Sequence, residues 1–394
     1  MMDTKLNALR DMNIALIMDG GANGLGVIHS LSDFKDEIII VALANSRSFA
    51  HKSKFVEHTF RYNTDQELKN LLFQINDTCK KIIPFPGSDK NFQHLIKLKE
   101  KLNRFSIFWK NEDNFLLGKE YQLEKAEQAG IDIPKSIIVA NDKELKQLDT
   151  FNPPYIIKPS DGAGDRIGLF KAEITSERSV VEKWASKCFE KKQSALISEY
   201  IPGDDSCLLT FGGYAYKGQL LAHFTGRKLA QQPRYRGVST ISESYPIPEL
   251  QALGASFVKT VNFTGIFQFE VKQSTANKKF YFIEFNPRNW VWGEVSTKNG
   301  TNLPYLKYKT ELTNSIHKEL PSNRTASAKV AYVSFKGVLI NIFKDKWLGI
   351  LSLLTSIFFS NRKIVFSVFK PNDLKPFFQF ISVSLKVVFN KLMK

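Results

Sequence analysis

Two alternating segments separated by a short polar loop constrain the fold of this chain more than any other feature. The first is GIFQFEVK at residues 265–272, the second is FIEFNPR at residues 282–288, and the polar residues 273–278 lie between them. Alternation of apolar and polar side chains is typical of strands, and a loop of this length is typical of a hairpin. The sequence therefore predicts two antiparallel strands.

The register of this hairpin predicts a cluster of oxygen ligands. If Glu270 lies opposite Glu284, Gln268 lies opposite Asn286. The side chains of Glu270, Glu284 and Asn286 then share one face, because side chains alternate with period two. Two carboxylates directly across from each other repel, so we expect a cation between them. Carboxylate and amide oxygens suit Mg²⁺ that also takes phosphate oxygens; an exposed hairpin with scattered acids is the alternative.

A lysine beside a glycine-rich loop supplies a second signal. Lys158 lies near the end of the apolar segment YIIKP at residues 155–159, and DGAGDRIG follows at residues 161–168. Such a pair can hold phosphates by charge and by backbone N–H groups. A lone lysine in a strand is more often an edge residue whose stem lies on apolar surface. The adjacent glycine loop favours phosphate binding.

A third segment has features that suit a purine nucleoside. The apolar run before Glu199 is followed by Pro202-Gly203 and then by Asp204 and Asp205. The backbone after Glu199 can pair with the adenine edge, and Asp205 can bind ribose hydroxyls. The same residues are also ordinary turn formers.

The glycine-rich stretch DGGANGLGVIHS at residues 19–30 suggests a dinucleotide site instead. Its glycines follow the spacing G-x-x-G-x-G, whereas the dinucleotide fingerprint needs G-x-G-x-x-G. The apolar run at residues 37–43 is followed by Ala-Asn-Ser rather than by a ribose-binding acid. We therefore expect a tight βα turn here, and a dinucleotide-dependent oxidoreductase is the weaker alternative.

The pattern of segments divides the chain of 394 residues into three regions. Residues 1–115 alternate short apolar runs with helical patterns, which predicts a parallel α/β domain. Residues 116–310 predict an α+β domain with lobes of about 116–195 and 196–310. Residues 311–394 form a basic, apolar and partly helical region.

Composition narrows the class of protein. The net charge is +16, and residues 335–394 contribute ten Lys or Arg against two Asp. Zinc-finger spacing and the basic-aromatic signature of single-strand binders are both absent from the sequence, so we expect no nucleic-acid partner. Three widely separated cysteines fit a reducing cytosol, and the first 13 residues lack the apolar segment of a secretion signal.

The segments, in this order, resemble the ATP-grasp superfamily. The motifs K-P-S-x-G-x-G, E-Y-I-P-G-D-D and E-F-N-P-R match the core of that superfamily over residues 116–310. In addition, SRSFAHKSKFVEHTF at residues 46–60 and GTNLPY at residues 300–305 are similar to carboxylate–amine ligases related to D-aspartate ligase. The resemblance implies an N-terminal α/β domain before a two-lobed ATP-grasp domain, with ATP between the lobes.

The resemblance also implies roles for particular residues. ATP and Mg²⁺ are the implied cofactors, with Mn²⁺ as the alternative metal. The implied nucleotide-binding residues are Lys119, Lys158, Gly162, Gly164, Glu199, Tyr200, Ile201 and Asp205. The implied metal ligands are Glu270, Glu284 and Asn286, and the implied catalytic residues are Lys228 and Arg288.

Two departures from the family pattern affect this interpretation. Asp165 and Arg166 stand in the glycine loop where small residues are expected, so we expect its contacts with phosphate to differ from those of the family. Trp290 and Trp292 are bulkier than usual after N-P-R, so we expect an acceptor pocket of a different shape.

The implied function is an ATP-dependent carboxylate–amine ligase. It would join a small carboxylate and an amine through an acyl phosphate, and an ATP-binding regulatory or scaffold protein without turnover is the alternative. Arg234, Arg236 and Arg288 could offer forked donors to an anionic substrate, although a solvated basic turn explains the first two equally well. A homodimer stays open.

The basic C-terminal region has two apolar segments. Residues 347–359 are too short to span a bilayer, and residues 376–389 begin a helical stripe. Such a helix can pack on its own domain or lie in an anionic membrane surface. We expect a cytoplasmic protein or one peripheral at the inner face of the membrane. The stripe comprises Phe377, Ile381, Leu385, Val388 and Leu392.

Overall fold

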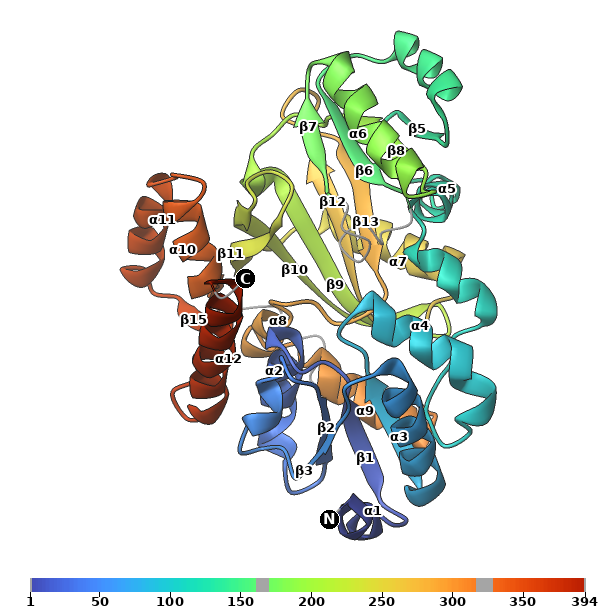
Figure 1. Cartoon of the computed structure of the whole chain (residues 1–394), viewed down its shortest axis with the longest axis vertical. Helices are drawn as coiled ribbons and strands as arrows, with labels where there is room; N and C mark the ends of the chain where they lie inside the picture. Colours follow the sequence, from blue (N-terminus) through green and yellow to red (C-terminus); the bar gives the residue numbers. More distant parts are fainter. Residues whose placement is uncertain (1, 161–169, 317–328, 393–394) are drawn as a thin grey trace.

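The N-terminal domain is a parallel sheet covered by helices. The computed structural model of the chain describes residues 2–160, 170–316 and 329–392 (Figure 1). In the described residues the sheet order is β3-β2-β1-β4, with every pairing parallel. Its strands are β1 Asn13–Ile17, β2 Ile39–Ala44, β3 His58–Arg61 and β4 Lys81–Phe85, and its helices are α1 Met2–Ala8, α2 Ala22–Leu31, α3 Asp65–Thr78 and α4 Asp89–Leu98.

A small lobe follows, with an antiparallel sheet of order β5-β8-β6-β7 in its described part. Its apolar core is separate from the rest of the molecule. β8 belongs to this sheet, a few residues beyond the predicted boundary of the first lobe. The elements are α5 Lys119–Gln128, β5 Ser136–Val139, β6 Tyr155–Pro159, β7 Glu173–Thr175, α6 Arg178–Glu190 and β8 Ala195–Glu199.

A larger sheet lies between the small lobe and the N-terminal domain (Figure 1). Its order over the described residues is β13-β12-β9-β10-β11-β14-β15. The strands are β9 Leu208–Tyr216, β10 Gln219–Gln232, β11 Val238–Ser244, β12 Gly265–Gln273, β13 Phe280–Asn286, β14 Val330–Val333 and β15 Lys363–Phe366. The helices are α7 Glu249–Thr260, α8 Glu294–Lys298, α9 Leu303–Thr313, α10 Phe335–Phe343, α11 Gly349–Phe358 and α12 Lys375–Leu392.

The predicted fold class is confirmed, because a parallel α/β domain precedes an antiparallel sheet and a larger sheet that is antiparallel apart from the described β14–β15 pair. Short 3₁₀ helices complete the described chain: η1 Ser32–Phe34, η2 Ala50–Lys52, η3 Lys99–Lys101, η4 Asn111–Leu117, η5 Asp142–Thr150 and η6 Asp205–Cys207. The apolar cores of the N-terminal domain continue into the large sheet, so these two parts pack as one body. The small lobe, with its own core, forms the opposite wall of any cleft between them.

The hairpin register predicted from the sequence is confirmed. Glu270 pairs with Glu284, Gln268 pairs with Asn286, and a β-bulge after Glu270 shifts the rest of the ladder by one residue. The turn between β9 and β10 lies at Lys217-Gly218. Both turn residues have positive φ, 50° and 75°, as a two-residue hairpin turn requires.

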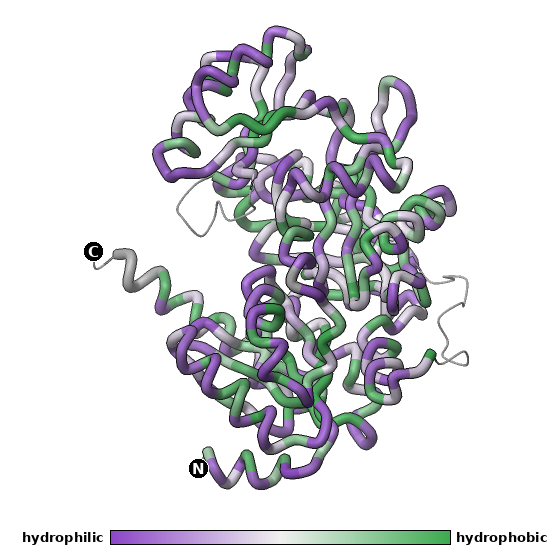
Figure 2. Tube along the Cα trace, turned by 90° about the vertical axis from the view of Figure 1, so that its right-hand side faces the viewer, coloured by the Kyte–Doolittle hydropathy of each residue, from purple (hydrophilic) through white to green (hydrophobic). Residues whose placement is uncertain are grey.

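The C-terminal region continues the large sheet. β14 pairs with β11, and β15 pairs with β14, so both strands lie in the same layer as the predicted metal ligands. The helices α10 and α11 cover this end of the sheet, and α12 lies at the periphery beside the N-terminal domain (Figure 1). The view turned by 90° also shows α12 at the edge of the molecule (Figure 2). Among the described residues, no helix combines the length and hydrophobicity needed to cross a bilayer.

Candidate active site

A cavity of about 590 Å³ is lined by the small lobe, the large sheet and the N-terminal domain. Lys158 and Glu199 line it from the small lobe, Glu270 and Glu284 from the large sheet, and Asp19 from the N-terminal domain. The volume is in the range of small-molecule sites, and converging polar groups on apolar walls are typical of such sites. This cavity is the candidate active site.

Each of the two opposed glutamates is paired with a lysine. Lys119 Nζ donates to Glu284 Oε1 at 2.6 Å, and Lys228 Nζ lies 2.8 Å from Glu270 Oε1. Lys119 begins α5, and its backbone N–H donates to the carbonyl of Ser160 just beyond β6, so the helix end is fixed beside the strand that carries Lys158. The cations expected between the carboxylates are thus supplied here by the chain itself.

Burial and charged neighbours shift the pKa values of Lys158 and Glu284. Burial and the neighbouring Lys119 ammonium together lower the pKa of Lys158 to about 8, although Glu284 opposes the shift. Burial alone would raise the pKa of Glu284, but the ammonium groups of Lys119 and Lys158 hold it well below its ordinary range. Glu284 is therefore an anion at neutral pH, and Lys158 is a cation that loses its charge unusually early.

The predicted metal ligands converge with chemistry that fits Mg²⁺. The two carboxylates and the Asn286 carbonyl are hard oxygen donors on one face, and Mg²⁺ uses few protein ligands when phosphates and water complete its shell. In the described part of the chain, no group of three or more His, Cys, Asp or Glu side chains is placed to hold a metal. Any metal here would therefore depend on a bound phosphate for much of its coordination.

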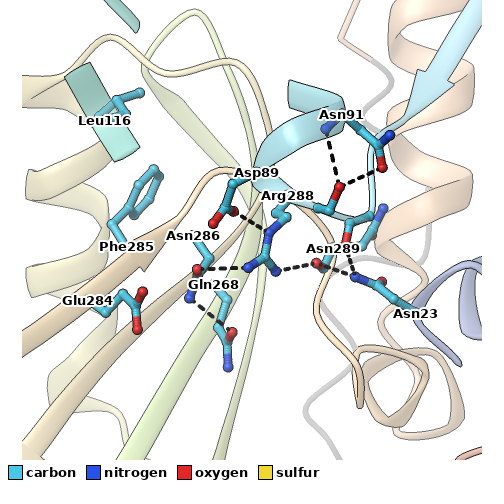
Figure 3. A network of polar contacts seen from close by, with 12 residues as sticks. Asn23, Asp89, Asn91, Leu116, Gln268, Glu284, Phe285, Asn286, Arg288 and Asn289 are labelled. Carbon is cyan, nitrogen blue, oxygen red and sulfur yellow. Dashed lines mark hydrogen bonds and ion pairs between the residues drawn. The ribbon is translucent and has the colours of Figure 1, made fainter. Parts of the chain in front are cut away.

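Arg288 is held at the junction of the large sheet and the N-terminal domain (Figure 3). Its Nε donates to Asp89 Oδ1 at 2.6 Å, and its Nη2 donates to Asn286 Oδ1 at 3.2 Å. Its Nη1 donates to the carbonyl of Asn289 at 3.2 Å, and Asn23 donates to the same carbonyl at 2.8 Å. The guanidinium is thus oriented within the cavity wall beside a predicted metal ligand.

The predicted glycine-rich turn contributes Asp19, Ala22 and Asn23 to the cavity wall. Asp19 Oδ1 accepts from the Gly21 N–H at 2.7 Å, and Asn23 donates to the Gly87 carbonyl at 2.9 Å. A Cβ on Gly20 or Gly87 would overlap a neighbouring side chain, which explains glycine at these positions. Burial raises the pKa of Asp19, although its hydrogen bond from Gly21 and the Arg288 charge oppose the shift.

The predicted adenine and ribose residues separate into two groups. Glu199, Tyr200 and Ile201 line the cavity. Asp205 does not: its carboxylate is buried and accepts from the backbone and side chain of Gln231 and from the Tyr235 N–H. Asp204 lines the cavity in its place. An adjacent pair of acids left this choice open in the sequence.

Lys272 is a cavity residue that the sequence analysis missed. Its Nζ donates to the Tyr200 hydroxyl at 2.7 Å and lies 3.9 Å from the centre of that ring. Burial lowers the pKa of Lys272 to about 8. The signal that could have found it is the alternation along β12, which puts Gln268, Glu270 and Lys272 on one side.

The predicted substrate arginines Arg234 and Arg236 have different surroundings. Arg236 lines the cavity and forms an ion pair with Glu173 of the small lobe at 2.6 Å. The guanidinium of Arg234 instead lies over the Trp347 ring, 4.2 Å from its centre, at the start of α11. Of the two, only Arg236 has access to the candidate site in the described structure.

Gly162, Gly164, Asp165 and Arg166 lie outside the described residues.

The two tryptophans after N-P-R are almost fully buried in the cavity wall. Their rings occupy space left by glycines, because a Cβ on Gly212 would reach 2.3 Å from Trp290, and one on Gly226 would reach 2.8 Å from Trp292. The large sheet is therefore built around these rings.

Comparison with known proteins places the fold. No protein-family model matches the chain, and no curated protein matches it. Among solved structures, the chain is similar to N5-carboxyaminoimidazole synthetase from Staphylococcus aureus, with a TM-score of 0.58 and 15% identity over 78% of this chain and 79% of that one. It is similar to L-amino acid ligase from Bacillus licheniformis, with a TM-score of 0.59 and 14% identity over 79% and 77%.

A third similar structure is the biotin carboxylase domain of the Hydrogenobacter thermophilus 2-oxoglutarate carboxylase, in complex with MgADP, ADP and bicarbonate. The TM-score is 0.64, and the identity is 16% over 80% of this chain and 73% of that one. At such identities the likeness establishes the fold alone. The chain has the ATP-grasp fold, and the finer resemblance to D-aspartate ligase rests on the sequence.

Proposed function

We propose that this chain is an ATP- and Mg²⁺-dependent carboxylate–amine ligase. The observation that carries the proposal is the cluster of Lys119, Lys158 and Lys228 with Glu270 and Glu284 in one cavity between the lobes. Cations placed beside carboxylates suit a reaction between an anionic nucleophile and an anionic phosphate, in which charge neutralisation and alignment are the main tasks.

The reaction begins with the oxygen of a substrate carboxylate attacking the γ-phosphorus of ATP. The bond from that phosphorus to the β–γ bridging oxygen breaks, which leaves an acyl phosphate and ADP. An amine then attacks the acyl carbon, phosphate leaves, and the amine loses a proton to give the amide. The lysines would bind the transferring phosphate, and Glu270, Glu284 and Asn286 would hold Mg²⁺, which neutralises phosphate charge when bound.

The substrates are assigned to the side of the cavity formed by Arg288 and the N-terminal domain. Arg288 would orient the carboxylate or the acyl phosphate, and Arg236 would close over it from the loop after β10. Among the similar structures, one is an L-amino acid ligase by name, and another was solved with MgADP. The first name supports ligation as the chemistry, and the second supports a nucleotide with Mg²⁺ as the cofactor. A small carboxylate and an amine are proposed as the substrate classes from the sequence resemblance.

Two measurements test this function. A thermal-shift panel should show stabilisation by ATP with Mg²⁺ and none by NAD(P), because ligands that bind the native state raise its melting temperature. ADP release, measured over a set of amino acids and amino sugars, should depend on the amine. ATP binding without turnover for any pair would favour the regulatory alternative, and stabilisation by NAD(P) alone would favour an oxidoreductase.

A further inference from the structure

The C-terminal helices expose an unusual amount of apolar surface. Among the described residues, twelve of the nineteen exposed large apolar side chains lie between residues 335 and 387. Scattered apolar residues on a surface are ordinary, but a contiguous patch marks an interaction site. These side chains would therefore mark an interaction site if they form one continuous surface.

Helix α10 is apolar on two sides. Phe335, Leu339 and Phe343 recur every four residues and are exposed, the last at 78%. Val338 and Ile342 lie on the other side and pack into the core beside β11. The side that carries Val338 and Ile342 packs in the core, so the exposed apolar side is available for a different contact.

Helix α11 also has one exposed and one buried apolar face. Leu348, Leu351 and Phe358 share one exposed face, and Phe359, which caps the helix, is 89% exposed. Ile350 and Ile357 point the opposite way and are buried in the same core as α10. The two helices are joined by a short loop and pack on each other as a helical hairpin.

The apolar side chains of helix α12 lie in two different environments. Phe377 and Phe380 pack against the N-terminal domain, and Phe380 contacts the Phe49 ring at 5.4 Å between centroids. Ile381 and Leu385 are exposed instead. The inner face of α12 is therefore structural, and its outer face is free in the described structure.

A row of phenylalanine rings connects the helical hairpin to Phe377 at the start of α12. Phe335 and Phe358 both contact Phe366 of β15, with centroids 5.0 and 6.3 Å apart. Phe366 contacts Phe369 at 5.9 Å, and Phe369 contacts Phe377 of α12 at 5.4 Å. Apolar rings thus continue from the helical hairpin to α12. We call the outer faces of α10, α11 and α12, with this row, the C-terminal apolar surface.

The charges of this region identify the partner. Six of its described lysines are exposed and have no ion pair within the described residues: Lys336, Lys344, Lys346, Lys363, Lys375 and Lys386. Two further cations whose side chains are described are engaged, Arg362 with Glu243 and the buried Lys370 with Glu294. Of its two acids, Asp373 is buried against His29 and Ser53. The free charge is therefore almost entirely positive.

We propose that the C-terminal apolar surface docks on an anionic lipid bilayer. Exposed phenylalanine and leucine side chains enter the headgroup region, and the lysines bind lipid phosphates, which is the division of labour in interfacial helices. A second copy of the chain fits less well, because pairing two such surfaces would oppose lysines to lysines. This inference stands apart from the ligase proposal, since it concerns a different face of the molecule.

Vesicle flotation without nucleotide tests the proposal. The full chain should float with vesicles containing phosphatidylglycerol and phosphatidylcholine, and less with phosphatidylcholine alone. Binding should weaken at about 1 M salt, where the Debye length is about 3 Å. Truncation of α12 is not a clean test, because its inner face holds the N-terminal domain. Substitutions of exposed side chains avoid that problem.

Matched variants separate the apolar and the charged contributions. Phe343→Glu with Phe359→Glu should lower vesicle binding at least about tenfold at an unchanged melting temperature. Phe115→Glu, at an exposed phenylalanine outside this surface, should bind as the parent does. Gln at Lys336, Lys344 and Lys363 should remove most of the salt-sensitive part, whereas Gln at the exposed Lys101, Lys183 and Lys191 should remove much less.

Three outcomes would overturn the proposal. One is a parent protein that stays in the soluble fraction with anionic vesicles at low salt. Another is equal binding by the double glutamate variant and by Phe115→Glu. The third is a stable dimer in sedimentation that the double glutamate variant dissociates while neither protein binds vesicles, since the partner would then be a second copy of the chain.

Discussion

Replacing Glu284 by Gln separates two interpretations of the glutamate pair. The sequence places two carboxylates opposite each other, which on its own predicts that removing one relieves repulsion. The structure pairs Glu284 with Lys119 at 2.6 Å and puts the Lys158 charge nearby. Because these ammonium groups stabilise the carboxylate, we expect Glu284→Gln to destabilise the ligand-free protein.

The magnitude follows from burial. The Lys119 side chain is 11% exposed and that of Glu284 is 32% exposed. Removing one partner of a fully buried ion pair costs about 3–5 kcal/mol, because the other charge is left uncompensated. Solvent screens the Glu284 side of this pair, so the expected loss is about 1–3 kcal/mol. Turnover should fall by about 100-fold or more, because a preorganised charge at the phosphate site is lost.

Urea unfolding at neutral pH measures the loss of stability. A second variant, Lys119→Met with Glu284→Gln, should recover part of it, because no uncompensated partner is left. Glu124→Gln is the matched control: its pair with Lys125 is exposed, so its effect should stay within about 0.5 kcal/mol.

The pH dependence has a defined sign. The pKa of Glu284 in the folded chain lies below its ordinary 4.5, so the ion pair stabilises the fold above that pH and less as the pH falls. The difference between parent and variant should therefore shrink in acid. If Glu284→Gln is as stable as the parent at neutral pH, the lysines do not compensate the carboxylate and this reasoning is wrong. Full ADP release by the variant at saturating Mg²⁺ would refute the metal assignment.

Three further predictions concern other residues of the cavity. Lys158→Met should lower ATP affinity as well as rate, since phosphate is bound in the ground state, and equilibrium ATP binding measures this. Because burial lowers the pKa of Lys158 to about 8, kcat/KM for ATP should fall as the pH rises past 8, and Lys158→Arg should abolish that fall. Arg236→Ala should raise KM for the carboxylate substrate, with Glu173→Gln, which frees the same guanidinium, as comparison; an unchanged KM for every substrate leaves Arg236 without a binding role. Asp205→Asn should lower stability by about 1–3 kcal/mol with little change in KM for ATP, since its carboxylate accepts from three N–H groups, and the opposite pattern would restore a ribose role.

The hairpin of β12 and β13 shows what the sequence could predict. Period-two alternation, a short loop and a pair of glutamates suggest a register with Glu270 opposite Glu284, and the structure has that pairing. The parallel N-terminal sheet was predictable for a similar reason, since apolar runs alternate with helical patterns. Local periodicity is sufficient for both.

The partners of the glutamates were beyond local patterns. Lys119 and Glu284 are 165 residues apart, and Lys228 reaches Glu270 across the intervening strand β9. The choice between Asp204 and Asp205 also depends on a distant segment, because the carboxylate that faces Gln231 is the one removed from the cavity. Strand order determines these contacts, and no spacing in the sequence encodes strand order.

Under the proposed function, the lysine–glutamate pairs determine how the site takes up the metal and the polyphosphate. Each lysine needed for phosphate is held by a carboxylate needed for the metal, so neither can change partner alone without leaving a buried charge unpaired. If a phosphate bound without a metal, it would attract Lys119 and Lys228. The two glutamates would then be left without a compensating charge. A metal without a phosphate would displace two ammonium groups beside Lys158. The arrangement therefore favours the metal and the polyphosphate arriving together, because only then does every charge of the cluster gain a new partner in one step.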